Sequence, residues 1–399
     1  MMTREYTGKI QKLIDPNFIS IVLSSYGIIG FFFRPFADWI AFKFKNRKII
    51  LFAAPVIITF TFIPFIIVQN NITSIIQSIG IGVGASMIGT YELLFKEQYT
   101  ENKSYLTVSV LALPPLLADF LTSPIQSAVL MLPSNENNDK FPMIWIWIIA
   151  LLFLITTFVM IFFVKENREF VGNIKQGEKV LKSNKYSILW IIIISFLGFL
   201  IAFIKFANSG SVAILNLENI NQGKYSKVII DSISGYISLV FSGFQLIGSI
   251  LMIYLLRKFK KEKYLFIFGI AFWIIFHIIT LFVNDSIFYF IILSINGFSY
   301  GLIYNLFLAL ILSTSFSKAK ITPMGIYQGL LSLGIAFSTF FTSFIKENLK
   351  IDFKTTNYIV NGTIIGLLIF IILFYLIAEY IKEKYVIFTG KKIKIQVIQ

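Results

Sequence analysis

The stretch that decides the fold is residues 264–283, YLFIFGIAFWIIFHIITLFV. These consecutive residues include no Asp, Glu, Lys or Arg. A helix needs about 20 apolar residues to cross roughly 30 Å of hydrocarbon, which is the length of this block. Comparable blocks recur from one end of the 399-residue chain to the other. The pattern therefore predicts an all-α integral membrane protein rather than a soluble protein with buried helices.

The composition agrees with this interpretation. Hydrophobic residues make up 57% of the chain and charged residues only 14%, with a mean hydropathy of +0.80, which lies outside the range of soluble globular domains. Cysteine is absent and histidine occurs once. The sequence therefore excludes disulfides, thiolate metal sites and histidine-cluster metal sites, and we expect no cofactor.

The apolar blocks predict about eleven membrane spans. Each block is long enough to cross a bilayer and is bounded by polar residues. The predicted spans lie at about residues 17–42, 49–68, 71–95, 105–132, 143–164, 187–212, 229–256, 264–283, 286–312, 323–345 and 358–381.

Positive charge is concentrated in alternate loops. The net charge is +15, and its basic residues gather in 43–48, 257–263 and the tail at 391–394. Cytoplasmic loops of membrane proteins carry this excess of Lys and Arg. We therefore expect a multi-pass protein of a cell membrane, in a bacterial cell by its Ile-, Phe-, Lys- and Asn-rich composition, with a cytoplasmic C-terminus and no nucleic-acid partner. The loop at 346–354 fits this pattern least well.

A polar connection divides the spans into two groups. We predict an N-terminal bundle over 1–164, a cytoplasmic linker over 165–186, a C-terminal six-helix bundle over 187–381 and a basic cytoplasmic tail over 382–399. A similarity between two basic segments supports two repeats. KFKNRK at 43–48 follows the first predicted span, and KFKKEK at 258–263 follows the second span after the linker. Parallel repeats of this kind build one class of membrane transporters.

Residues 34–48, RPFADWIAFKFKNRK, resemble a signature of the major facilitator superfamily. That signature lies between the second and third helices and reads Arg-Pro, then Gly-x-x-x-Asp-basic-x-Gly-basic-basic. The match is partial, because the family's acidic position falls on Phe42 and its glycines on Asp38 and Lys45. The carboxylate of Asp38 stands four residues earlier, about one helical turn back on the same face.

The resemblance implies a two-bundle fold, a monomer, and secondary transport of a small solute by alternating access. It also implies a cytoplasmic latch, a set of charges that hold the bundles together. Glu92 joins this set through a contact with Arg47, although a local pair with Lys96 is equally consistent with its position. A second interpretation of Asp38, Arg47 and Lys48 is that these charges only anchor a helix end and set the topology. The latch candidates are Arg34, Asp38, Arg47, Lys48 and Glu92.

The family's first helix has no counterpart in the predicted spans. Only 42 residues precede Lys43, whereas 71 separate residue 187 from Lys258 at the corresponding point of the second bundle. The difference is about one span and its loop. Two interpretations remain open: a start codon that omits a real first span, or a truncated product that has lost transport.

Ionisable groups inside membrane spans are costly and are candidates for function. Asp119 lies near the middle of its span between prolines, which suits proton coupling, binding of a cationic group, or a structural contact with a neighbouring helix. Lys205, with Asn208 one turn further on, is a candidate for an anionic solute, for pairing with Asp119, or for snorkelling to the membrane surface.

Polar and aromatic residues of two later spans complete the candidate list. Tyr304, Asn305 and Gln328 are of the kind that orients a solute or binds a neighbouring helix. The single histidine, His277, favours a structural or interfacial place. Gly80 and Gly84 fit close helix packing rather than a nucleotide site, because they lie inside an apolar span.

These observations favour a secondary active transporter of an unidentified small solute, with a coupling ion as one option. The sequence has no P-loop lysine motif, so we expect an ion or solute gradient to supply the energy. An uncoupled facilitator and a non-transporting membrane protein stay open. An enzyme is disfavoured, because the spans carry no dense cluster of carboxylates and histidines.

Overall fold

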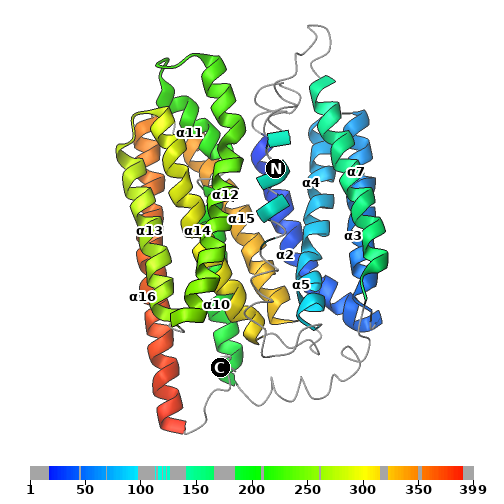
Figure 1. Cartoon of the computed structure of the whole chain (residues 1–399), viewed down its shortest axis with the longest axis vertical. Coiled ribbons are helices and arrows are strands. Elements are labelled where there is room, and N and C mark those ends of the chain that lie inside the picture. Colours follow the sequence, from blue (N-terminus) through cyan, green and yellow to red (C-terminus); the bar gives the residue numbers. More distant parts are fainter. Residues whose placement is uncertain are drawn as a thin grey trace.

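The computed structural model describes residues 18–44, 46–68, 70–97, 141–165, 185–207, 211–259, 262–314, 322–348 and 353–389, with short helical pieces between 113 and 125. Every regular element in these ranges is a helix, and most of the helices run along the long axis of the molecule (Figure 1). The span predicted at 105–132 and the linker predicted at 165–186 lie largely outside the described residues.

The helices before the linker form the N-terminal bundle. Most boundaries agree with the predicted spans within a few residues, but the span predicted at 71–95 is two helices that meet at Met87. The helices are α2 (Ile19–Phe44), α3 (Lys48–Ile67), α4 (Asn71–Ser86), α5 (Ile88–Glu97) and α7 (Phe141–Phe163).

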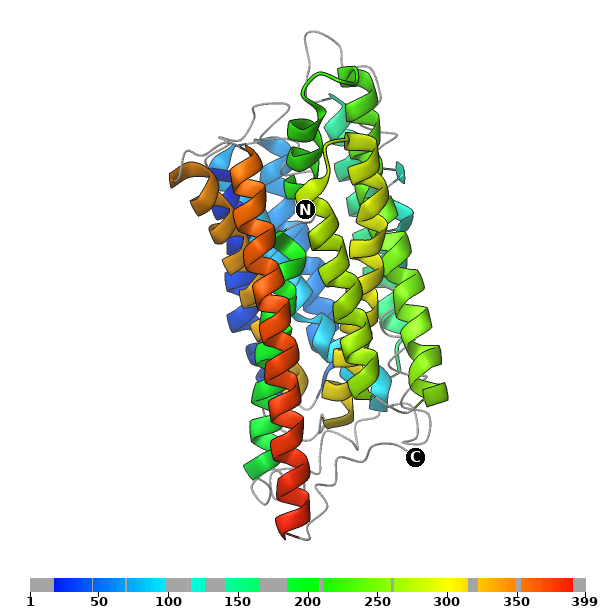
Figure 2. The same cartoon turned by 90° about the vertical axis from the view of Figure 1, so that its left-hand side faces the viewer.

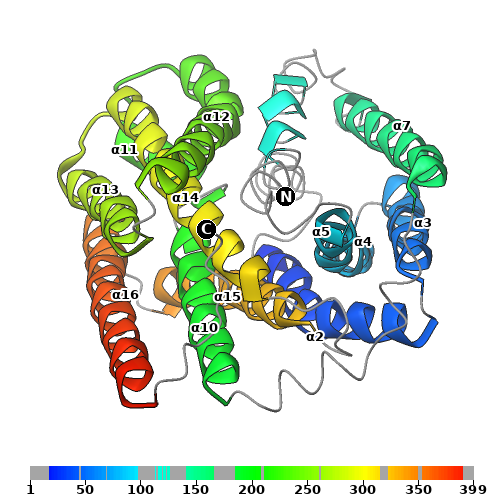
Figure 3. The ribbon, with the colours of Figure 1, turned by 60° about the horizontal axis from the view of Figure 1, so that its bottom comes forward.

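The helices after the linker form the C-terminal bundle. The span predicted at 187–212 corresponds to a helix over Lys185–Ala207, and a short second helix begins at Ser211, near the predicted end of the span. The helices are α10 (Lys185–Ala207), α11 (Ser211–Asn221), α12 (Lys227–Phe259), α13 (Glu262–Phe282), α14 (Ser286–Thr314), α15 (Pro323–Asn348) and α16 (Phe353–Thr389). In Figure 3 the two bundles lie side by side, with α2 and α15 between them.

Eight stretches of the described helices are apolar and long enough to cross a membrane, with lengths of 19 to 28 residues. Large apolar side chains also point outward, among them Phe60, Phe163 and Phe282, which are each more than 70% exposed. Such a surface is stable against lipid and costly in water. The all-α membrane fold is therefore confirmed, while the number of eleven spans stays a prediction.

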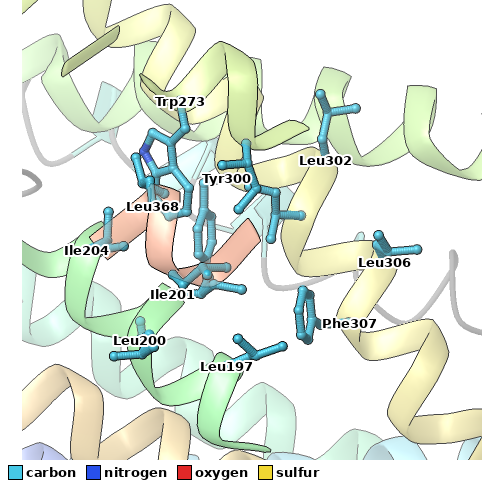
Figure 4. Packing of buried hydrophobic residues seen from close by; sticks show 14 of the residues in the cluster. Leu197, Leu200, Ile201, Ile204, Trp273, Tyr300, Leu302, Leu306, Phe307 and Leu368 are labelled. Carbon is cyan, nitrogen blue, oxygen red and sulfur yellow. The ribbon is translucent and has the colours of Figure 1, made fainter. Parts of the chain in front are cut away.

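The largest hydrophobic core lies within the C-terminal bundle. Trp273 and residues of α10 lie around Tyr300, and Phe307 lies further along α14 in the same core (Figure 4). Two glycines of α14 let α12 approach closely, because a Cβ on Gly297 or Gly301 would collide with a backbone carbonyl of α12. The C-terminal bundle therefore has one continuous core, which favours its moving as a unit.

The two ends of the molecule differ in charge. We call the end of the molecule at which α2 ends and α3 begins the basic end. It carries Lys43 and Lys48 at that junction, and Arg257 and Lys258 at the end of α12. Helix α16 has 37 residues and extends beyond the other helices at this end (Figure 2). Whether the basic end faces the cytoplasm stays a prediction.

At the opposite end, the turn after α11 is fixed to the turn before α14. Lys224 forms an ion pair with Asp285, and the Tyr225 hydroxyl donates to the same carboxylate at 2.8 Å. The hydrogen bonds from Lys224, the Phe288 amide and Tyr225 hold the pKa of Asp285 well below its ordinary value. These contacts hold the ends of α11 and α14 together within the C-terminal bundle.

Helices α2 and α15 form the main contact between the bundles. Small residues allow the approach: a Cβ on Gly27 would collide with Ser332 and Ala336 of α15. Toward the end opposite the basic one, the hydroxyls of Ser24 and Thr339 lie 2.7 Å apart in a hydrogen bond. The two bundles therefore touch along much of the length of α2.

Candidate functional site

At the basic end, a carboxylate of one bundle caps a helix of the other. Asp38 lies near the end of α2 and is 7% exposed. Its Oδ2 accepts hydrogen bonds from the backbone N–H of Thr322 at 3.1 Å and from the Thr322 hydroxyl at 2.5 Å. Thr322 stands just before α15, and its Oγ1 accepts from the Gly325 N–H at 3.0 Å. A helix N-terminus favours a negative charge, so Asp38 binds where α15 is most receptive to it.

The surroundings of Asp38 fit this contact. Arg47 is 5% exposed and lies close enough to attract the Asp38 carboxylate electrostatically. Gly325 leaves the space that the carboxylate fills, because a Cβ at that position would collide with Asp38 Oδ2. Of the latch candidates, Asp38 and Arg47 therefore meet at the boundary between the bundles.

Lys48 lies elsewhere. Its ammonium donates to the Phe162 carbonyl of α7 at 2.9 Å and lies 5.8 Å from the centre of the Phe52 ring. Both residues belong to the N-terminal bundle. Among the interactions that the structure gives for Lys48, none crosses to the other bundle.

A second polar contact joins the bundles one level deeper. Glu92 of α5 is 2% exposed and accepts a hydrogen bond from the side-chain amide of Gln328 of α15 at 2.6 Å. Arg34 of α2 is 6% exposed and lies close enough to attract Glu92 electrostatically. The contacts that the sequence predicted for Glu92, with Lys96 or with Arg47, stay predictions, and the side chain of Lys96 lies outside the described part of the chain. We call the Glu92–Gln328 contact, together with Asp38–Thr322, the basic-end contact.

Tyrosines of α14 lie beside this charged pair. Tyr300 and Tyr304 are one helical turn apart, and their rings stack with centroids 5.5 Å apart. Tyr304 is half-buried and lies within electrostatic range of Arg34, Glu92 and Tyr26, all from the N-terminal bundle. The tyrosine pair therefore faces the other bundle.

Lys205 lies at the junction of three helices of the C-terminal bundle. Its ammonium is 4.3 Å from the centre of the Tyr300 ring, 5.5 Å from that of Phe241 on α12 and 4.9 Å from that of Phe206 on α10 itself. Aromatic faces attract cations at such distances. These contacts direct the ammonium toward rings of the protein, an arrangement that argues against the snorkelling interpretation.

Residues 4–339 match the family profile described as Major Facilitator Superfamily. The chain belongs to the Major Facilitator Superfamily. No curated protein matches the chain. The resemblance inferred from residues 34–48 is thus confirmed.

Solved structures of other superfamily members share the fold. The human organic anion transporter TETRAN is 12% identical, with a TM-score of 0.67 over 93% of this chain and 88% of that one. The proton:xylose symporter XylE is 12% identical, with a TM-score of 0.68 over 92% and 91%. The transporter FucP in its outward conformation is 10% identical, with a TM-score of 0.62 over 94% and 96%. At such identities the likeness shows the fold alone.

Membership of the superfamily makes the chain a multi-pass membrane transporter of a small solute. The family consists of transporters rather than enzymes, which agrees with the sequence-based expectation. Within the part of the chain that the structure describes, no group of three His, Asp or Glu residues gathers to hold a metal ion.

One further candidate of this superfamily member, Asn305, stands apart from the basic-end contact. Asn305 is 2% exposed and follows Gly297 and Gly301 at four-residue spacing, which places it on the face of α14 that packs on α12. Asp119 and Asn208 lie outside the described residues. The neighbouring Phe120 lies against α12, close to Gly243.

Sequence reasoning missed two residues of the site. Thr322 is followed by Pro323, and Thr before Pro is a signal for a helix start, although nothing local indicates that Asp38 shares the cap. Tyr26 lies in a predicted span with no feature that singles it out. His277 is buried and bonds Asn361 Oδ1 at 2.8 Å within the C-terminal bundle, in line with the structural place that we predicted.

Proposed function

We propose that the chain is a secondary active transporter of the cell membrane that moves its solute by alternating access between the two bundles. The basic-end contact carries the proposal. Asp38 and Thr322 are 284 residues apart in the chain, and Glu92 and Gln328 are 236 apart. Each pair joins one bundle to the other, so these bonds close the basic end and must break for it to open.

The strength of these bonds suits a reversible gate. A net hydrogen bond to a charged group contributes about 1.5–3 kcal/mol. A few such bonds hold two rigid bodies together and still allow them to separate when a ligand favours the other state. A continuous hydrophobic interface at the same place would be harder to open and close.

The solute contacts that we propose are Lys205, Tyr304, Asn305 and Gln328, together with Asp119 and Asn208. Tyr304 supports this choice, because it is half-buried and lies within electrostatic range of Arg34 and Glu92 of the N-terminal bundle, and Lys205 contacts the ring of the neighbouring Tyr300. Gln328 would link solute and gate, since it already bonds Glu92.

Proton coupling is the energy source that we propose. Asp38 and Glu92 are buried carboxylates that each oppose an arginine, so a proton on either would cancel one of the attractions that close the gate. Asp119 stays the candidate inside its own span. XylE is named a proton:xylose symporter, which supports such coupling in this fold.

We also propose that the basic end faces the cytoplasm, by the positive-inside rule, and that the transporter is a monomer. The C-terminus would then lie in the cytoplasm, because α16 ends at the basic end (Figure 1).

Thiol labelling tests alternating access without knowledge of the solute. The chain has no cysteine, so Tyr304→Cys supplies the single reactive thiol. A membrane-impermeant thiol reagent is added to right-side-out and to inside-out vesicles. Alternating access predicts labelling from both sides. Leu302→Cys is the control: Leu302 has no exposed surface, and we expect labelling from neither side.

Labelling of Tyr304→Cys from one side only, under every condition tried, would instead support the non-transporting alternative. The same vesicles also test coupling. A proton-coupled transporter changes its labelling ratio when a pH gradient is imposed, whereas an uncoupled facilitator does not.

A further inference from the structure

We propose that anionic phospholipids bind at two equivalent places on the basic end, one on each bundle, with the lipid phosphate at Lys43 of α2 or at Lys258 of α12. This inference is independent of the proposed transport function, and it adds a lipid partner and the charge class of that lipid. It starts from the two similar basic segments, KFKNRK at 43–48 and KFKKEK at 258–263. Of their residues, the proposed gate uses Arg47 alone.

The similarity of the two segments extends into the helices that precede them. Trp39 stands four residues before Lys43, and Tyr254 stands four residues before Lys258. In both helices the ammonium lies over that ring, 5.2 Å from the ring centre of Trp39 and 5.7 Å from that of Tyr254. The two repeats therefore build the same local arrangement, a lysine held over an aromatic ring one turn earlier.

Both arrangements lie on the outside of the molecule. The two lysines are exposed, and α2 and α12 lie at opposite edges of the molecule when the basic end comes forward (Figure 3). Each lysine has an aromatic residue one turn before it and a Phe directly after it, and all four are at least 40% exposed: Trp39, Phe44, Tyr254 and Phe259. Such amphipathic rings gather where a membrane meets water. This placement puts both ammonium groups at the level of lipid headgroups.

An exposed apolar face leads along each helix to its lysine. It begins at Phe32 on α2 and at Ile247 on α12, and it continues through Phe36 and Ile250. In each helix the lysine stands 11 positions after the start of this face, which is a rise of about 16 Å. One leaflet contributes about 15 Å of hydrocarbon. An acyl chain can therefore lie along each helix while its headgroup reaches the lysine.

The charge of the two segments favours an anionic headgroup. Residues 43–48 include four basic residues and no acidic one, and residues 257–263 include five basic residues and one acidic one. Basic segments beside a membrane attract anionic lipids. The ring under each ammonium fixes its position, and a lipid phosphate supplies a charge-assisted hydrogen bond. A zwitterionic headgroup offers the same phosphate, but its own cation weakens the attraction.

Native mass spectrometry of the purified full chain in detergent tests the proposal, because it counts bound lipids. Phosphatidylglycerol and phosphatidylcholine with identical acyl chains are titrated separately. We expect two molecules of phosphatidylglycerol to bind about fivefold more tightly than phosphatidylcholine, which corresponds to about 1 kcal/mol for one lysine at the membrane surface. Equal binding of the two lipids overturns the proposal.

Variants assign one lipid to each lysine. Lys43→Gln and Lys258→Gln should each leave a single tightly bound phosphatidylglycerol, and the double variant should bind the two lipids equally. Lys43→Arg combined with Lys258→Arg should keep both molecules, since Arg supplies the same charge. A preference for phosphatidylglycerol that survives in the double Gln variant overturns the proposal.

Two matched controls separate these sites from a general excess of positive charge. Lys48→Gln removes the same charge at the same end, but the Lys48 ammonium already donates to the Phe162 carbonyl. Lys224→Gln removes a lysine that lies 5.3 Å from the ring centre of Tyr225 and pairs with Asp285 at the opposite end. Both variants should still bind two molecules of phosphatidylglycerol. An equal loss with Lys48→Gln and with Lys43→Gln would indicate diffuse attraction and overturn the two sites.

Discussion

Replacing Asp38 with alanine should open the basic end. The change deletes two hydrogen bonds, from the Thr322 amide at 3.1 Å and the Thr322 hydroxyl at 2.5 Å. Each contributes about 1.5 kcal/mol at the low end for a charged acceptor. When the end opens, water takes over these bonds. The closed state alone therefore loses about 3 kcal/mol, which shifts the equilibrium about a hundredfold toward the open state.

The assay is the rate at which an impermeant thiol reagent labels Tyr304→Cys from the basic end. We expect Asp38→Ala to raise this rate about ten- to a hundredfold, with a ceiling once the open state predominates. Labelling from the opposite end should fall, because alternating access closes one end as the other opens.

The matched control removes a helix cap that joins no bundles. Asn70 caps α4 by accepting from the Thr73 N–H at 2.9 Å, and Asn70→Ala therefore loses a comparable cap within the N-terminal bundle. We expect it to leave the labelling rate unchanged. An equal effect of both variants, or no effect of Asp38→Ala, would refute the reasoning that the cap holds the gate.

Three other outcomes are expected. Glu92→Gln removes the charge that faces Arg34, and it should raise labelling from the basic end about tenfold; an unchanged rate contradicts a role in the gate. Oxidation of Ser24→Cys with Thr339→Cys, whose native hydroxyls are 2.7 Å apart, should block labelling from the opposite end until a reductant is added, and labelling that persists would place the gate elsewhere. Asp285→Asn should lower the unfolding midpoint at neutral pH. Because the pKa of Asp285 is lowered in the folded state, this difference should be full above about pH 4 and vanish only below it; a difference that grows as the pH falls would reverse the assigned sign.

The membrane spans could be predicted because length and hydropathy determine them directly. The boundaries of α13 and α14 follow the apolar blocks to within a few residues. The division at Met87 was not predictable in the same way. The residues around Met87 are small or apolar, so hydropathy continues without interruption while the helix is divided.

The partners within the site were harder to predict. Helical spacing suggests partners three or four residues away, and by this reasoning Glu92 pointed to Lys96. The hydrogen-bond partner that the structure gives, Gln328, lies on the other bundle, and one sequence gives no direct information on contacts over such distances. The same holds for Lys205, whose rings come from α12 and α14 as well as from its own helix.

Some positions were nevertheless marked as candidates by the sequence. The resemblance of residues 34–48 to the family signature marked Arg34 and Asp38, and a charge near the end of an apolar span marked Glu92. The structure places all three at the boundary between the bundles. Their roles as gate residues stay a proposal.

The most direct test of alternating access measures the distance between the bundles at both ends at once. Spin-label pairs are attached to cysteines at Lys43 and Lys258 for the basic end, and at Asn71 and Lys224 for the opposite end. In the proposed mechanism, Asp38→Ala lengthens the first distance and shortens the second. Two distances that stay fixed, or that change in the same direction, would contradict the account.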